Sequence, residues 1–187
     1  VRTVRDRILG SLLLSAFDGG FTNKTLFKDI PPNTALVGRL RKDARLFAPP
    51  APQTAGKGRP RLYGAAIETP YQLLTNAAIA WQKSTVFAAG KPRVFVYKSV
   101  DRCRWKSSGG HDVRLIVVKP LSATPHKAGR KLFFAHPGYL ICSDPEIAIE
   151  QVLQADVWRW EIEVGFREQK TQLGLGEAQT YTQPAVA

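Results

Sequence analysis

The sequence predicts an α/β fold, and three observations support this prediction. First, an apolar run at residues 8–17 stops abruptly at Asp18-Gly19-Gly20, which is typical of a strand that ends in a turn. Second, a short helix and another strand are predicted directly afterwards, over residues 22–29 and 34–40, which completes a strand, helix, strand unit. Third, several strand-rich segments precede one long helical segment near the C-terminal end.

The elements of the first 40 residues follow from local signals. The run at 8–17 suits a buried strand or a short helix, but its abrupt stop favours a strand and places Asp18 at the strand's C-terminal tip. Thr22 or Asn23 can cap the short helix, and the Pro-Pro pair after Asp29 ends it. The segment from Thr34 to Leu40 then resumes as a strand.

Residues 41–64 form a basic segment rich in Pro and Gly, with six Lys or Arg against one Asp. This composition predicts a linker or an extended arm. A brief helix is expected from Thr69-Pro70 to about Ala78. Segments 81–88, 93–102 and 113–118 are rich in strand formers and separated by short turns, so they predict an antiparallel meander.

The last third of the chain combines two short strands with a helix. Strands are predicted at 131–134 and 139–142. Ser143 and Glu146 have the spacing of a capping box, which predicts that the helix begins there and continues to about Leu173. The tail after the helix is expected to be unstructured.

Composition narrows the classes of function. With 187 residues the chain suits one domain, and its formal net charge of +12 indicates a polyanionic partner, with nucleic acid favoured over an acidic membrane surface. The apolar runs are too short for a membrane span. Cys103 and Cys142 form neither a disulfide framework nor a zinc motif, which predicts a reducing cytosolic compartment. The three histidines are scattered, so no histidine-based site is expected.

Three charged residues on one side of the late helix are candidates for a functional site. Arg159, Glu163 and Lys170 lie within about 40° of one another around a helix, which puts one acid between two bases. A carboxylate flanked in this way can hold a divalent cation while its neighbours bind phosphate, and a solvated face with i,i+4 ion pairs is the alternative. An α/β core can bring Asp18 and Glu163 to one edge of a sheet, where two carboxylates make a Mg²⁺ site plausible.

Three motifs, in the expected order, resemble insertion-sequence transposases of the DDE superfamily, in the branch with the signature Tyr-x2-Arg-x3-Glu-x6-Lys. Arg159, Glu163 and Lys170 match the last three members of that signature at the proper spacing. The resemblance covers residues 18–179 and rests on three stretches: D-G-G-F-T-N from Asp18, G-Y-L-I-C-S-D-P from Gly138, and R-W-x-I-E-x-x-F-R-E-x-K-x-x-L-G-L from Arg159.

The resemblance implies a partial RNase H-like catalytic core with a mainly β insertion. Its divisions would be a truncated N-terminal part of the core at 1–40, the basic linker or arm at 41–64, the insertion at 65–125, the last core strand and catalytic helix at 126–177, and a disordered tail at 178–187. The implied activity is metal-dependent cleavage and strand transfer of double-stranded DNA at transposon ends. The resemblance also implies that the protein forms a homodimer on the DNA and has no membrane partner. Its expected location is the bacterial cytoplasm, in association with the nucleoid.

The resemblance also assigns roles to residues. Asp18 and Glu163 would coordinate Mg²⁺ or Mn²⁺, with two ions in an intact site. Arg159 and Lys170 would contact DNA phosphates. Trp105 is similar in placement to a tryptophan that stacks on a flipped base, and a hydrophobic contact within the insertion is its alternative role. In the basic arm, a simple linker and contact with the DNA backbone remain equally open, and the contacting residues would be Arg41, Lys42, Arg59 and Arg61.

Two departures from the family pattern qualify these roles. Asp156 stands where the signature has tyrosine, so it is expected to weaken DNA binding or to intercept Arg159. Only Asp6 precedes Asp18, and it is too close in sequence to be the first aspartate of a DDE site. The chain therefore looks like the C-terminal part of a transposase without its first metal ligand. A catalytically inactive, basic DNA-binding remnant and a fragment without specific activity are the alternatives.

Overall fold

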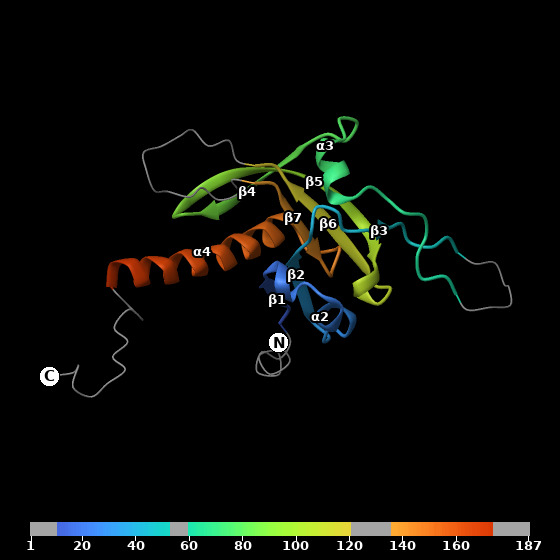
Figure 1. Cartoon of the computed structure of the whole chain (residues 1–187), viewed down its shortest axis with the longest axis horizontal. Coiled ribbons are helices and arrows are strands. Elements are labelled where there is room, and N and C mark those ends of the chain that lie inside the picture. The colour runs from blue at the N-terminus through green and yellow to red at the C-terminus, as the bar shows by residue number, and fades with distance from the viewer. Residues whose placement is uncertain (1–10, 53–59, 121–135, 174–187) are drawn as a thin grey trace.

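A computed structural model of the chain describes residues 11–52, 60–120 and 136–173, and it shows a mixed α/β molecule in which strands predominate (Figure 1). A seven-stranded sheet has the order β1-β2-β7-β6-β5-β3, and β4 pairs with β5. The strands are β1 (Leu13–Phe17), β2 (Thr34–Arg39), β3 (Leu46–Phe47), β4 (Gln82–Ala88), β5 (Lys91–Trp105), β6 (Asp112–Val118) and β7 (Gly138–Cys142). The helices are α2 (Lys24–Lys28), α3 (Pro70–Thr75) and α4 (Ile149–Leu173), with single 3-10 turns η1 (Gly19–Phe21) and η2 (Lys106–Ser108).

The predicted strand, helix, strand unit is confirmed. Strands β1 and β2 pair in parallel, from Leu13 opposite Thr34 to Phe17 opposite Gly38. Between them, the Oδ1 atom of Asn23 accepts a hydrogen bond from the backbone N–H of Leu26 at 3.2 Å and caps α2. Because parallel strands end on the same side, the residues after β1 and β2 meet at one edge of the sheet.

The predicted antiparallel meander is also confirmed, as β4, β5 and β6. Strand β6 then pairs with β7, and β7 pairs with β2, both antiparallel. The strands of the 65–125 segment therefore continue the sheet that contains β1 and β2. In the basic arm, Leu46 of β3 is buried and lies opposite Trp105 of β5, so the described part of the arm packs against the sheet.

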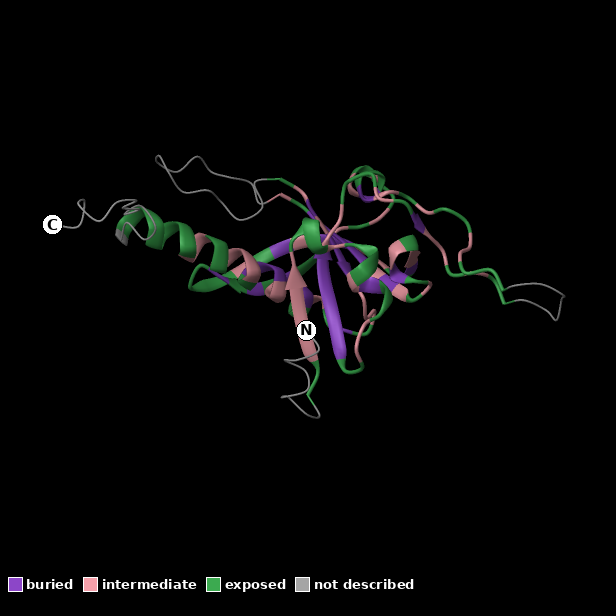
Figure 2. Cartoon of the chain, turned by 60° about the horizontal axis from the view of Figure 1, so that its bottom comes forward, coloured by how far each residue is buried: buried purple, intermediate pink, exposed green. Residues whose placement is uncertain are grey.

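Both faces of the sheet are apolar and each has its own cover. Alternation along β2 directs Ala35 and Val37 to the face covered by α4, and Leu36 to the face covered by α2 and α3. On the first face, Val152 and Val157 of α4 are fully buried. Figure 2 shows that burial decreases along α4, whose later turns are exposed beyond the sheet. The candidate site lies at the boundary between these two parts of the helix.

The expected start of the late helix was wrong. Helix α4 begins at Ile149, and residues 145–147 form a turn in which the Asp144 carboxylate accepts from the Glu146 N–H at 2.9 Å. The Ser143 hydroxyl instead accepts a hydrogen bond from the Leu36 N–H of β2 at 2.9 Å. The Ser143 hydroxyl is therefore engaged with β2 and does not cap α4.

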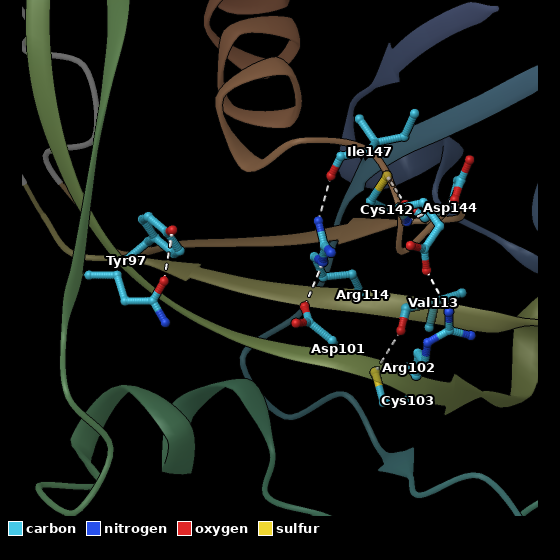
Figure 3. A network of polar contacts seen from close by, with 11 residues as sticks. Tyr97, Asp101, Arg102, Cys103, Val113, Arg114, Cys142, Asp144 and Ile147 are labelled. Atoms are coloured by element: carbon cyan, nitrogen blue, oxygen red, sulfur yellow. Dashed lines mark hydrogen bonds and ion pairs between the residues drawn. The ribbon is translucent and has the colours of Figure 1, made fainter.

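The segment that leads into α4 is fixed to the sheet by arginines (Figure 3). Arg114 of β6 donates from Nε to Asp101 at 2.6 Å and from Nη1 to the carbonyl oxygen of Ile147. Arg102 of β5 forms an ion pair with Glu146 at 2.6 Å. These contacts set the direction in which α4 leaves the sheet.

The strand predicted at 131–134, the tail at 178–187, Asp6 and Arg59 lie outside the described residues. Within the described ranges, every helix is too short or too polar to cross a membrane.

Candidate active site at the ends of β1 and β2

Two residues of opposite charge lie next to each other where the parallel strands end. Asp18 directly follows β1 and Arg39 is the last residue of β2, and the register that pairs Phe17 with Gly38 places Asp18 beside Arg39. Ala16 and Val37, two residues earlier in each strand, belong to the core under α4. Because side chains alternate along a strand, Asp18 and Arg39 lie on the α4 face.

Helix α4 supplies the other charged groups of the site. Its core-facing stripe includes Val152 and Val157, and Asp156 lies in the same stripe with only 1% of its surface exposed. Arg159 and Glu163 follow one and two turns later. The Arg159 side chain is nearly buried and that of Glu163 is half exposed, so the polar site opens to solvent along the helix.

A chain of alternating charges connects β2 to α4. Arg39 donates from Nε to Asp156 Oδ1 at 3.1 Å and from Nη2 to Oδ2 at 2.9 Å, which is a bidentate pair. Asp156 Oδ1 also lies 3.5 Å from Arg159 Nε, and Arg159 Nη1 donates to Glu163 Oε1. Four side chains thus form one continuous network.

The acids near Arg39 change the pKa of its guanidinium group. Burial of this guanidinium group is the largest single influence and lowers its pKa, but the hydrogen bonds and charge of Asp156, together with weaker contributions from other acids, raise the pKa above its ordinary value. The charges of Asp18 and Glu163 act in the same direction. The structure therefore brings the strand-tip carboxylate and the helix carboxylate within electrostatic reach of one cation.

Lys170 does not join this group. It is exposed near the C-terminal end of α4, about 10 Å along the helix axis from Glu163, in the part of the helix that extends past the sheet (Figure 1). Its position suits contact with an extended partner that also reaches Arg159.

Trp105 and the basic arm lie apart from the carboxylates. Trp105 is half-buried on the face of the sheet opposite α4, where it packs edge-on against Phe27 with ring centroids 5.5 Å apart. In the arm, Arg41 forms a bidentate pair with Asp43 at 3.0 and 3.2 Å, while Lys42 and Arg61 are exposed. These residues do not converge with Asp18 and Glu163.

Sequence reasoning missed Arg39. The sequence pattern relates Asp156 to Arg159, but the two hydrogen bonds that Asp156 accepts come from Arg39. A signal was present, because a charged acid in the apolar stripe of a helix is stable only with hydrogen bonds and a partner of opposite charge. The arginine that ends the neighbouring strand was the candidate within reach.

The donor chemistry of the two exposed carboxylates fits Mg²⁺, which prefers hard oxygen ligands and is often held by one or two carboxylates together with water and phosphate. Asp18 is exposed and Glu163 is half exposed, so both can reach an ion from solvent. In the part of the chain that the structure describes, no three His, Cys, Asp or Glu side chains are grouped as metal ligands.

Gly38 fixes the turn that holds Asp18. A Cβ atom at Gly38 would lie 2.3 Å from Thr22 Oγ1 and 2.8 Å from Thr22 Cγ2, and Thr22 Oγ1 donates to the Asp18 carbonyl oxygen at 3.2 Å. We expect Gly38→Ala to lower the free energy of unfolding by about 1–3 kcal/mol, because Thr22 and the turn must shift. Urea denaturation would measure this change.

Gly20→Ala is the matched control for Gly38→Ala, since a Cβ at Gly20 meets no atom within 4 Å. This variant should be as stable as the wild type or slightly more stable. Equal destabilisation by both substitutions would contradict the steric explanation.

Comparison of the chain with protein families, with curated proteins and with solved structures found no match.

Proposed function

We propose that this protein is a DNA transposase of the DDE type, with an RNase H-like core and a β insertion, and that Asp18 and Glu163 are two carboxylates of its metal-dependent site. One observation carries the proposal. Asp18, at the tip of β1, lies beside Arg39 at the end of β2. Arg39 is in turn connected to Glu163 on the long helix through Asp156 and Arg159, although Asp18 and Glu163 lie at opposite ends of the described chain. Their order and surrounding motifs match the family that the chain resembles, apart from Asp156 at the tyrosine position of the signature and the first aspartate, for which Asp6 is too close in sequence.

The roles of the side chains follow from their chemistry. Asp18 and Glu163 would hold Mg²⁺ or Mn²⁺. In an intact site, which also has a first aspartate, two such ions would supply activation of an attacking oxygen and stabilisation of the leaving oxygen of a phosphodiester. Arg159 donates a hydrogen bond to Glu163 and would have to release this carboxylate when an ion binds. Arg159 and Lys170 bind the DNA backbone, because a guanidinium group can grip phosphate with two hydrogen bonds and an ammonium group acts as a point charge.

A second candidate is a catalytically inactive protein that binds double-stranded DNA through its basic surface. The ion pair between Glu163 and Arg159 favours it, because the carboxylate must give up Arg159 before it can coordinate a cation. The net charge of +12 supports DNA binding under either candidate.

Nicking of supercoiled plasmid separates the two candidates. If the protein is a transposase, it nicks plasmid in the presence of Mg²⁺, and Glu163→Gln reduces nicking to the level of a protein-free control because a metal-ligating oxygen is lost. Glu168→Gln, which removes an exposed carboxylate from the same helix, should leave nicking unchanged. Gel electrophoresis of nicked and closed circles provides the measurement.

Equal nicking by wild type and Glu163→Gln would contradict catalysis at this site. Binding of duplex DNA by both proteins would then leave the inactive DNA-binding protein as the remaining candidate.

A further inference from the structure

The tip of the hairpin that joins β5 to β6, residues 105–111, lies between helix α2 and the basic arm (Figure 1). On one side α2 packs against this tip, where a Cβ atom at Gly109 would lie 3.1 Å from Lys28 Cγ. On the other side, a Cβ atom at Gly110 would lie 3.4 Å from Leu62 Cδ2 of the arm. Three segments that are distant in sequence therefore form one continuous surface.

Each of these three segments contributes exposed cations. Lys24 and Lys28 lie about one turn apart on the same side of α2, Lys106 lies on the hairpin tip, and Arg61 lies in the arm. Among the described residues, none of these four cations forms an ion pair. Lys106 Nζ lies 5.5 Å from the centroid of the Phe47 ring, and this lysine remains exposed. We call the four cations the tip surface.

The positive charge of the tip surface is less neutralised than that of the neighbouring strands. On β5, Arg102 forms an ion pair with Glu146 and Arg104 forms one with Asp112, each at 2.6 Å. In the tip surface itself, Asp29 directly follows α2 and offsets one of four positive charges. The remaining charge is available to an anionic partner.

The framework beneath the tip surface is well packed. Phe27 of α2 is fully buried and lies edge-on to Trp105. Ser108 of the hairpin tip is also buried, and its Oγ atom lies 2.8 and 2.9 Å from the carbonyl oxygens of Trp105 and His111. The backbone that carries the cations is therefore ordered before a partner binds, which reduces the entropic cost of binding.

The tip surface also leads to the candidate active site. Thr22, two residues before Lys24, donates to the Asp18 carbonyl oxygen at 3.2 Å and lies against Gly38 at the end of β2. Helix α2 therefore begins at the strand ends, and Lys28 at its other end lies against the hairpin tip. A rod-like polyanion that lies along α2 passes from the hairpin tip to the strand ends.

We propose that Lys24, Lys28, Arg61 and Lys106 bind the phosphate backbone of duplex DNA and direct it from the hairpin tip toward Asp18. This inference takes its partner from the proposed function and adds a surface outside the candidate active site. Ammonium groups bind phosphates as point charges, which suits contacts that position DNA without reading its base sequence.

The test measures binding of a fluorescent DNA duplex in EDTA over a range of salt concentrations. For the wild type, affinity should fall steeply with salt because bound phosphates release counterions. The tip variant combines Lys24→Gln, Lys28→Gln and Lys106→Gln. Its slope of log affinity against log salt should be shallower by about 2–3, because each lost phosphate contact removes about 0.9, and its binding at 0.1 M salt should be about a hundredfold weaker.

The matched control combines Lys83→Gln, Lys91→Gln and Lys119→Gln and changes the net charge equally. Lys83 and Lys91 lie in the hairpin of β4 and β5, and the backbone N–H of Lys119 donates to Val96 of the same hairpin at 2.8 Å. This hairpin includes the end of β5 that is opposite Trp105. The control variant should keep the wild-type slope, with affinity within about threefold of the wild type.

An equal decrease in slope for both triple variants would show that net charge, rather than the tip surface, determines binding. A wild-type slope for a folded tip variant overturns the proposal as well. If the tip variant does not melt cooperatively, Lys24→Gln combined with Arg61→Gln takes its place, because neither side chain forms a hydrogen bond or ion pair in the described structure. The slope should then decrease by about two, and an unchanged slope counts against the tip surface.

Binding in EDTA does not require catalysis, so the failure of this proposal and that of the proposed function are distinguishable. A shallower slope for the tip variant, without Mg²⁺-dependent nicking by the wild type, supports the tip surface on an inactive DNA-binding protein. Nicking that depends on Glu163, together with a wild-type slope for the tip variant, supports the transposase and overturns the tip surface. A wild type that shows no salt-dependent DNA binding overturns both.

Discussion

Asp156→Leu is expected to lower the free energy of unfolding by about 3–5 kcal/mol, because it leaves two arginines facing each other without their shared carboxylate. Arg39→Leu should be less harmful, since Asp156 retains Arg159 at 3.5 Å as a partner. The asymmetry follows from the arrangement of one acid between two bases. Urea denaturation of the two single variants and the double variant measures these changes.

The double variant Arg39→Leu, Asp156→Leu should recover most of the stability that Asp156→Leu loses. The Asp156 side chain is 2% exposed and lies beside buried valines, so a leucine there packs into an existing apolar stripe. A double variant whose loss equals the sum of the two single losses would contradict the coupling of Arg39 with Asp156.

Lys98→Met is expected to lower the free energy of unfolding by about 3 kcal/mol, since it removes a buried ammonium group that donates to carbonyl oxygens at the end of α3. Lys98 is 1% exposed, and its Nζ donates to the carbonyl oxygens of Leu73, Leu74 and Asn76 at the C-terminal end of α3. These carbonyl oxygens have no further helical turn to bond them. Methionine preserves the stem of the side chain but supplies no donor.

Lys83→Met, in the exposed part of β4, is the control for Lys98→Met and should change stability by less than about 0.5 kcal/mol. Thermal and urea denaturation of both variants provide the comparison. An equally small effect at Lys98 would show that solvent reaches the end of α3 and satisfies its carbonyl oxygens.

Local sequence signals predicted most of the elements. The turn at Asp18-Gly19-Gly20, the cap at Asn23 and the short turns of the meander each specify a local conformation, and all of them occur in the structure. Thr69 also begins α3, with a capping box to Gln72. These features depend on residues within a few positions of one another, so they can be predicted from the sequence alone.

Contacts between distant segments could not be read from the sequence in the same way. Ser143 has the spacing of a capping residue, but its hydroxyl accepts from Leu36 on a neighbouring strand, and the helix begins later. The stripe of Arg159 and Glu163 could be placed on one side of a helix, whereas the partner of Asp156 depends on which strand end lies beneath α4. The periodicity of a sequence predicts which residues share one face of a helix or strand, but it does not predict which other element packs against that face.

The connectivity of the sheet also has a consequence for how the site forms. Arg39 and Asp156 are 117 residues apart in the chain, and the hydrogen bond that joins β2 to the segment after β7 spans 107 residues. The local hairpin of β4 and β5 can form early, but closing so long a loop is entropically unfavourable until other contacts support it. We therefore expect the charged network to assemble late in folding, after β2 has paired with β7.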